Sequence, residues 1–294
     1  MATKQDWIKA GKIAAEVREW SKKLIKVDSK LSEVADKIDN KIKEKGAIPA
    51  FPVSLAINEC AAHYAPVFND PIVITEDMCI KIDLGVCVNG AIGDTAYTVD
   101  LTKKYNDLVK ASIEARDNAV KLITPGVTLS EIGKTINETI QSYGYTPIVN
   151  LSGHGLGEFE VHCSPSIPNY DTTDKTELEK GMTIAIEPFA TNGAGKIKNS
   201  GIANIFSQIG SKPVRDLMSR NILKEIKTYQ NLPFASRWLC EKFHPTKVGF
   251  ALRMLKQAGN IHDYPPLVEI EKGMVTQSEH SLFVEEDGCT ILTK

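Results

Sequence analysis

The segment 78–94 places the tightest constraint on how this chain can fold. At its centre, Asn89-Gly90 separates two runs of apolar and β-branched residues, which is the strongest local signal for a two-residue β-hairpin turn. Such a turn places Asp94 opposite Gly85 and, because side chains alternate along a strand, on the same face as Asp83. Two carboxylates that converge on one sheet face repel each other unless a cation lies between them. The hairpin therefore predicts a cation site.

Two later segments repeat part of this pattern, in which an acid follows a methionine by five positions. Met78–Asp83 is the first copy, Met182–Glu187 the second and Met274–Glu279 the third. Because five is odd, the acid of a strand lies on the face opposite its methionine. The three segments thus offer carboxylates to one side of a sheet, and Asp94 makes a fourth. One copy would fit an ordinary solvated sheet face, but three copies in phase favour a metal site.

The composition limits the class of protein. Of the 294 residues, 42% are hydrophobic and 24% are charged, and the formal net charge is −2. This charge balance argues against a dedicated nucleic-acid binder, which usually carries a basic excess. The chain begins without an apolar signal region, and no apolar run approaches the ~20 residues of a membrane span. The six cysteines form no CxxC pair, which is typical of reduced thiols. We expect a cytoplasmic protein without a membrane or specific nucleic-acid partner.

The helical periodicity indicates an internal duplication. Amphipathic helices are predicted over 4–26, 30–45, 104–123 and 129–143. The second pair repeats the first 98 residues later, so that Leu31-Ser32-Glu33 recurs as Leu129-Ser130-Glu131. Polar residues recur as well as apolar ones, which amphipathic phase alone does not explain. A duplicated helix-helix-strand unit predicts two pseudo-symmetric halves with the site between them.

The second half contains a predicted insertion. Asp83 and Asp94 are close in sequence, whereas Glu187 and Glu279 are separated by a long segment with helical stretches around 214–229, 234–243 and 246–259. Three short helices also suggest a helix-turn-helix DNA binder. Without a strongly basic helix, however, a wall or lid of the site is favoured.

These observations together predict an α+β fold with a mostly antiparallel sheet. We expect a single catalytic domain over 1–294, with halves of roughly 1–100 and 101–294, and a helical insertion subdomain over 205–266.

The histidines add candidate site residues. His154 lies in the glycine-rich stretch 152–157, where it offers a nitrogen ligand beside the four carboxylates. His63 and His162 fall almost at repeat-equivalent positions, and a site role or a structural role remains open for both. The sequence has no GxSxG, P-loop or HExxH motif. The other three histidines are expected to be structural or exposed: His244, His262 and His280.

The candidate ligand set resembles the five metal ligands of the pita-bread metallohydrolases, which include methionine aminopeptidases, aminopeptidase P and prolidase. The set is Asp83, Asp94, His154, Glu187 and Glu279. Further segments resemble type 2 methionine aminopeptidases in their short, archaeal-like form: Ala50-Phe-Pro52, Asn58, Ala61-Ala-His-Tyr64, Leu232-Pro-Phe-Ala235, Arg237-Trp-Leu239 and Tyr264-Pro-Pro-Leu267. The chain departs from the family in the stretch 154–162, which replaces a more basic one, and at Ser278, where a Phe is usual.

This resemblance implies two divalent metal ions, for which Co, Mn, Fe and Zn all suit carboxylate and imidazole ligands. Asp94 and Glu279 would bridge both ions, Asp83 would hold one, and His154 and Glu187 would hold the other. A metal-bridged hydroxide would attack the peptide carbonyl.

The resemblance also implies roles for residues around the metals. Glu187 would accept the proton of the nucleophile. His162 would stabilise the oxyanion and His63 would contact the amide nitrogen. The residues expected to line the methionine pocket are Phe51, Val161, His162 and Tyr264.

The implied function is removal of the initiator methionine from nascent proteins and peptides that have a small second residue. We expect a monomer, and the resemblance allows association with the ribosome. Two alternatives remain open. One is an Xaa-Pro dipeptidase or aminopeptidase P-like hydrolase, and the other is a non-catalytic pita-bread protein that binds ribosomes or RNA. The binding protein ranks last, because all five ligands are present.

Overall fold

The predicted hairpin is present in the computed structural model, which describes all 294 residues. Strands β3 (Cys79–Val88) and β4 (Ala91–Asp100) pair along their whole length, with Gly85 opposite Asp94. The two loop residues, Asn89 and Gly90, have φ angles of 52° and 94°, as this turn requires. Strand β1 (Ile48–Ile57) pairs with the other edge of β3. The expected register is therefore confirmed.

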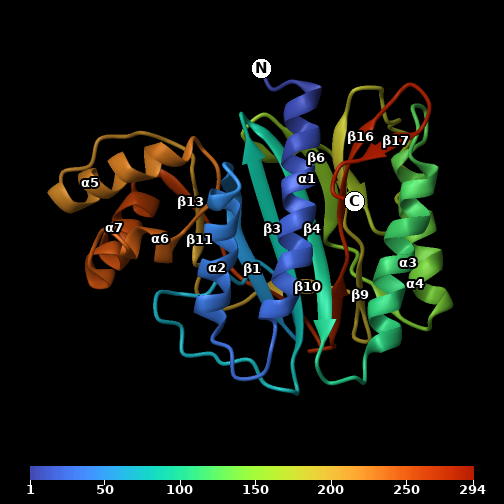
Figure 1. Cartoon of the computed structure of the whole chain (residues 1–294), viewed down its shortest axis with the longest axis horizontal. Helices are drawn as coiled ribbons and strands as arrows, with labels where there is room; N and C mark the ends of the chain where they lie inside the picture. The colour runs from blue at the N-terminus through green and yellow to red at the C-terminus, as the bar shows by residue number, and fades with distance from the viewer.

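The structure contains the two helix pairs of the predicted duplication (Figure 1). The first pair is α1 (Lys4–Ser21), followed by a short 3₁₀ turn (Lys22–Leu24), and α2 (Leu31–Glu44). The second pair is α3 (Asn106–Leu122) and α4 (Leu129–Ser142), and α4 begins and ends 98 residues after α2. Gly46 and Gly144 follow α2 and α4 with positive φ, which stops both helices. Thr128 and Glu131 form a capping box at the start of α4.

The strands of the second half form two further antiparallel sheets, of which one has five strands and the other three. The five-stranded order is β17-β16-β8-β6-β7, and the three-stranded order is β15-β9-β5. Their bounds are β5 (Thr146–Pro147), β6 (Ser152–Gly157), β7 (Glu160–Pro168), β8 (Thr183–Ile186), β9 (Phe189–Thr191), β15 (Val275–Gln277), β16 (His280–Val284) and β17 (Cys289–Ile291). Strands β15 and β16 belong to different sheets although only two residues separate them. The three acid-bearing segments thus reach the site from three sheets rather than from one.

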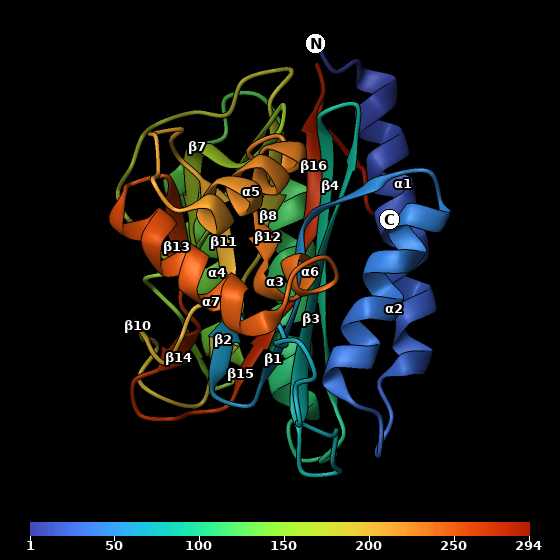
Figure 2. The same ribbon diagram turned by 90° about the vertical axis from the view of Figure 1, so that its left-hand side faces the viewer.

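The predicted insertion corresponds to a compact block of short helices and strands at the side of the molecule. Figure 2 shows α1 and α2 on one face of β3 and β4, with this block on the other side. The block consists of β11 (Ile205–Gln208), α5 (Leu217–Ile226), a 3₁₀ turn (Lys227–Tyr229), β12 (Phe234–Ala235), α6 (Ser236–Cys240), α7 (Pro245–Gln257) and β13 (Ile261–Tyr264). It has its own hydrophobic cluster of 12 buried residues. Whether 205–266 is a separate subdomain stays a prediction.

A small sheet next to this block completes the fold. Its order is β10-β14-β2, with β2 (Cys60–Ala62), β10 (Ile197–Asn199) and β14 (Leu267–Glu269). Strand β2 leads directly to His63, and β14 follows the Tyr264-Pro-Pro segment, so this sheet connects the two halves beside the site. None of the helices in the structure is long and apolar enough to cross a membrane.

Each half has its own hydrophobic core. A cluster of 29 buried residues lies between the first helix pair and the β1-β3-β4 sheet, and a cluster of 16 lies under α3 and α4. Helix α1 packs closely on β4 because Gly93 lacks a side chain. A Cβ at Gly93 would lie 2.6 Å from the backbone carbon of Ala10. This close approach fixes α1 directly behind the strand that carries Asp94.

Candidate active site

One cavity of about 290 Å³ collects every residue that the sequence predicts for the site. The predicted residues on its wall are Phe51, His63, Asp83, Asp94, His154, Val161, His162, Glu187, Tyr264 and Glu279. They come from both halves and from the insertion, so only the folded chain can bring them together.

The five candidate metal ligands lie on different parts of the sheets. Asp83 and Asp94 lie on one face of the β3–β4 hairpin, and His154 lies on β6, which pairs with β8. Glu187 directly follows β8. Glu279 lies at the joint between β15 and β16, where its backbone N–H donates to the carbonyl of Ala96, N to O 3.0 Å.

Ligand atoms of Asp94, His154 and Glu279 are close enough to share a metal ion, and Glu187 lies beside His154. His154 Nε2 lies 3.4 Å from Glu187 Oε1 and 3.9 Å from Asp94 Oδ2. Ligand atoms of Asp94, His154 and Glu279 all lie within 4.8 Å of one another. Such spacing suits donors that surround a cation at about 2 Å each.

Gln277 is a site residue that the sequence analysis missed. Its Nε2 donates to Asp83 Oδ2 and to Glu187 Oε2, both at 3.2 Å. It thereby bridges two carboxylates from different sheets. The signal was present, because Gln277 precedes Glu279 by two positions and strand alternation puts both on one face.

The carboxylates are crowded and poorly solvated. Burial raises the pKa of Asp83 to about 7. Burial, and then the charges of neighbouring carboxylates, raise the pKa values of Asp94, Glu187 and Glu279 well above their ordinary range. Burial lowers the pKa of His154 to about 3, so its ring is neutral near pH 7. Neutral imidazole and ionised carboxylate are the forms that bind metals.

Three carboxylate oxygens in this cluster have no hydrogen-bond partner although they are buried. They are Asp83 Oδ1, Asp94 Oδ1 and Glu279 Oε2. Buried polar atoms are almost always satisfied in native proteins, and an ion is one explanation of an exception. These orphaned oxygens, the raised carboxyl pKa values and the neutral His154 all fit a site for divalent metal ions.

The other two candidate histidines, His63 and His162, line the same cavity as the candidate metal ligands. The His162 ring packs edge-on against the His154 ring, with centroids 4.4 Å apart. The His63 ring packs against Tyr264 at 5.7 Å. Burial lowers the pKa of His63 to about 4. Burial within the cavity also lowers the pKa of His162. Both rings are therefore neutral near pH 7 and offer one N–H donor each.

His280 has a structural role, as expected. It is buried, lies outside the cavity and forms a hydrogen bond through Nδ1 to Thr293 Oγ1 at 2.8 Å. Some cavity residues were not predicted: Pro52, Ser54, Ala62, Asn150, Leu151, Ser152, Phe189, Ile205 and Pro233. Pro52, Ala62 and Pro233 lie in segments that carry the family resemblance, and 150–152 directly precedes Gly153-His154. Ile205 and Pro233 come from the insertion, whose placement no local pattern specifies.

Fold and site together define a metal-dependent hydrolase, and comparison with known proteins gives its family. The family model of metallopeptidase family M24 matches residues 6–211. The methionine aminopeptidase of Methanocaldococcus jannaschii is 45% identical over 288 residues, which cover 98% of this chain and 97% of that relative. The chain therefore belongs to metallopeptidase family M24 and, within it, to the methionine aminopeptidases. It uses divalent metal ions to remove methionine from the N-terminus of peptides.

Solved structures agree on the fold. A crystal structure of methionine aminopeptidase from Thermotoga maritima superposes with a TM-score of 0.72 at 24% identity, and the match covers 99% of this chain and 96% of that one. The prolidase from Pyrococcus furiosus gives a TM-score of 0.63 at 22% identity, but the match covers 100% of this chain and 65% of the prolidase. The prolidase-like and binding-protein alternatives are not favoured, because the relatives that are 36–45% identical over nearly the whole chain are methionine aminopeptidases.

Proposed function

We propose that five residues hold two divalent ions in this aminopeptidase: Asp83, Asp94, His154, Glu187 and Glu279. The observation that carries this assignment is the convergence of four carboxylates and one neutral imidazole with three buried, unpaired oxygens. As the resemblance implies, Asp94 and Glu279 would be shared by both ions, Asp83 would serve one of them, and His154 and Glu187 would serve the other.

The bound ions supply Lewis acidity, which activates water and polarises the carbonyl of the scissile bond. Residues of the chain do the rest. Glu187, which lies beside His154 Nε2 at the candidate metal site, would accept the proton that the water gives up. His162 donates an N–H to the carbonyl oxygen as negative charge develops there. His63 contacts the nitrogen of the bond that is cleaved.

The methionine side chain occupies the part of the cavity that is lined by Phe51, Val161 and Tyr264. Their apolar surfaces suit a thioether chain, and Tyr264 is held by the Ser207 hydroxyl, with 3.0 Å between the oxygens. A pocket of this kind discriminates by size and apolar contact, so the preference for methionine is finite. Because the cavity is confined, a small second residue of the substrate would fit beside the bound methionine more easily than a large one.

The setting of the reaction is also part of the proposal. We place the enzyme in the cytoplasm as a monomer that acts on nascent chains, and six cysteines without disulfide bonds support that compartment. Association with the ribosome would bring it to its substrates and stays a prediction.

The test is hydrolysis of Met-Ala-Ser by purified, metal-free protein to which Co²⁺ or Mn²⁺ is added back. We expect release of methionine only with metal, and loss of both release and metal binding in Glu279→Ala. Glu286→Ala, at an exposed site, is the matched control and should retain both. Cleavage of Xaa-Pro substrates in place of Met-Ala-Ser would support the prolidase alternative. Failure of the wild-type protein to bind metal would contradict the ligand assignment.

A further inference from the structure

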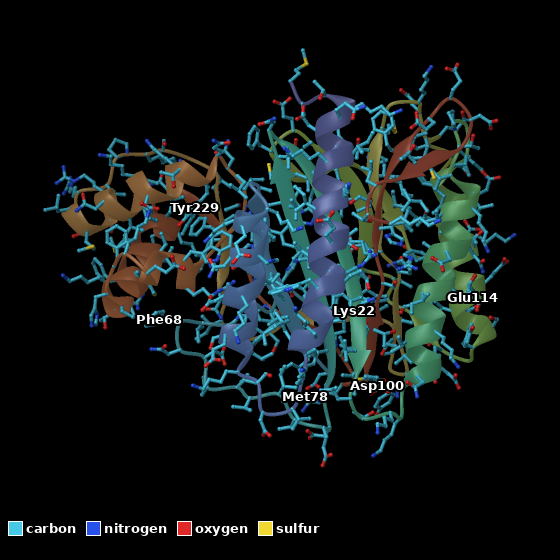
Figure 3. All side chains as sticks on the ribbon, viewed as in Figure 1. Lys22, Phe68, Met78, Asp100, Glu114 and Tyr229 are labelled. Carbon is cyan, nitrogen blue, oxygen red and sulfur yellow. The ribbon has the colours of Figure 1, made fainter.

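Two arginines at equivalent positions of the duplicated halves meet behind the metal cluster. Arg18 lies on α1 and Arg116 lies 98 residues later on α3. Both line a second cavity, which shares no residue with the catalytic one. Their side chains are only 12% and 14% exposed. Figure 3 shows Lys22, another residue of this cavity, on the side of α1 that faces α3.

Arg18 reaches the two segments that carry the proposed bridging ligands. Its Nη1 donates to Thr95 Oγ1 at 2.8 Å, and Thr95 Oγ1 donates to the backbone carbonyl of Glu279 at 3.0 Å. Thr95 directly follows Asp94. A single guanidinium therefore orients the hydroxyl that ties the strand of Asp94 to Glu279. The same Nη1 donates to the carbonyl of Thr293 at 2.8 Å, which anchors Arg18 itself.

Arg116 holds the residue on the other side of Glu279. Its Nη1 donates to Ser278 Oγ, N to O 2.6 Å. His280, which follows Glu279, lies with its Nδ1 3.4 Å from Arg18 Nη1. The side chains before and after Glu279 thus meet the arginines, while Glu279 itself points into the catalytic cavity, as alternation along an extended chain requires.

Glu279 needs such support because of its place in the fold. It lies at the joint between β15 and β16, outside both strands, so no continuous ladder fixes its backbone. Its buried Oε2 has no hydrogen-bond partner, and Asp94, Asp83 and Glu187 all repel its charge. Outer partners that orient a metal ligand typically change affinity or activity by about 10- to 100-fold when removed.

We propose that Arg18 and Arg116 are positioning residues for the proposed bridging ligands. Arg18 acts through Thr95 on Asp94 and Glu279, and Arg116 acts through Ser278 on Glu279. Neither arginine enters the catalytic cavity. The inference rests on the proposed ligand roles. It adds to the proposed metal site two arginines that occupy equivalent positions in the two halves.

The test is titration of Co²⁺ into metal-free variants, followed by calorimetry and by the visible absorption of bound Co²⁺. Arg18→Met and Arg116→Met should bind Co²⁺ about tenfold more weakly and with an altered spectrum. Their kcat on Met-Ala-Ser should fall, while KM stays within about twofold, because the substrate pocket is untouched. Thr95→Val should reproduce Arg18→Met, and Thr95→Ser, which keeps the hydroxyl, should restore binding.

A double variant tests the route of the effect. If Arg18 acts through Thr95, Arg18→Met combined with Thr95→Val weakens Co²⁺ binding no more than either change alone. Additive losses would overturn that route. If an arginine variant does not fold, Thr95→Val and Ser278→Ala test the same contacts.

Arg237→Met is the matched control, since Arg237 is another buried arginine, with 3% of its side chain exposed, that pairs with Asp36 and Asp39. It should lower thermal stability without changing Co²⁺ affinity. If Arg18→Met and Arg116→Met behave as this control does, their role is only structural and the proposal fails. Glu279→Ala tests the ligand assignment separately from the positioning role of the arginines. Unchanged metal binding in that variant would overturn the ligand assignment itself.

Discussion

Gly85 on β3 lies between Asp94 and Phe51, which are its paired neighbours on β4 and β1. The Phe51 ring occupies the space that a side chain at this position would take. A Cβ at Gly85 would lie 2.3 Å from Cε1 of Phe51. Because Phe51 also lines the catalytic cavity, the hairpin that presents the carboxylates also fixes one wall of the proposed methionine pocket.

Gly85→Ala should therefore displace Phe51 toward the cavity and impair substrate binding. Overpacking of this kind typically costs about 1–3 kcal/mol of folding stability. We also expect KM for Met-Ala-Ser to rise about tenfold, which corresponds to a loss of about 1.4 kcal/mol of binding free energy. Co²⁺ affinity should change little. Steady-state kinetics and Co²⁺ titration check both points. Adding Phe51→Ala should relieve the overlap and restore thermal stability. An unchanged KM in Gly85→Ala would show that Phe51 does not form the pocket wall.

The hairpin register was predictable because its determinants are local. Asn89 and Gly90 specify a two-residue loop, and the loop alone sets which residues of β3 and β4 face each other. The helix ends were equally local, since Thr128 with Glu131 at one end and Gly144 at the other mark α4 without reference to the rest of the chain. These signals lie within a few residues of what they specify.

The remaining parts of the site depend on contacts that are distant in sequence. Glu279 was expected in a strand, but it lies at a joint because β15 and β16 pair with β9 and β8 in different sheets. Nothing in the local pattern indicates this division. Likewise, Ile205 and Pro233 reach the cavity only because the insertion packs beside it. The ligand identities could be predicted, whereas the way the backbone holds them could not.

Asp83→Asn should reveal what burial of this carboxylate costs the metal-free protein. Burial raises the pKa of Asp83 to about 7 in the folded state, whereas an unfolded aspartate titrates near about 4. A raised folded pKa means that stability is present at low pH and is lost as pH rises from about 4 to about 7. The loss is at most about 1.4 kcal/mol per pH unit.

Asparagine mimics the protonated form and avoids this loss. The variant and the wild type should therefore unfold at similar temperatures near pH 4, and the variant should become progressively the more stable of the two up to pH 7. Thermal unfolding in the presence of a chelator measures the difference. With Co²⁺ bound the order should reverse, because the variant lacks a ligand. A difference that does not depend on pH would contradict the raised pKa.

Arg237→Met should destabilise the attachment of the insertion to the first half. Arg237 on α6 donates through Nε to Asp36 at 3.1 Å and also pairs with the buried Asp39, both on α2. Trp238 Nε1 donates to the same Asp39 Oδ2 at 2.7 Å. Removing the arginine leaves the Asp39 carboxylate buried without its cation, which typically costs about 3–5 kcal/mol.

Urea unfolding of the holoenzyme would measure this loss. Lys242→Met is a suitable comparison, since Lys242 also pairs with a carboxylate, Glu225, at 2.7 Å, but its side chain is 59% exposed. An exposed pair of this kind contributes about 1 kcal/mol or less. Equal effects of the two variants would mean that burial of Arg237 adds nothing to its ion pair.

His162→Ala and His154→Ala should separate a catalytic residue from a metal ligand although their rings are in contact, with centroids 4.4 Å apart. His154 Nε2 faces Glu187 and Asp94, so its removal should abolish tight Co²⁺ binding and, with it, activity.

His162 faces the cavity as a neutral N–H donor. Its removal should leave Co²⁺ binding nearly intact but lower kcat on Met-Ala-Ser by about 10²–10³, as loss of one oxyanion donor does. His244→Ala, at an exposed position outside the cavity, is the control and should keep both properties. If His162→Ala lost Co²⁺ as His154→Ala does, His162 would belong to the metal ligands and the oxyanion role would pass to another donor on the cavity wall, such as His63.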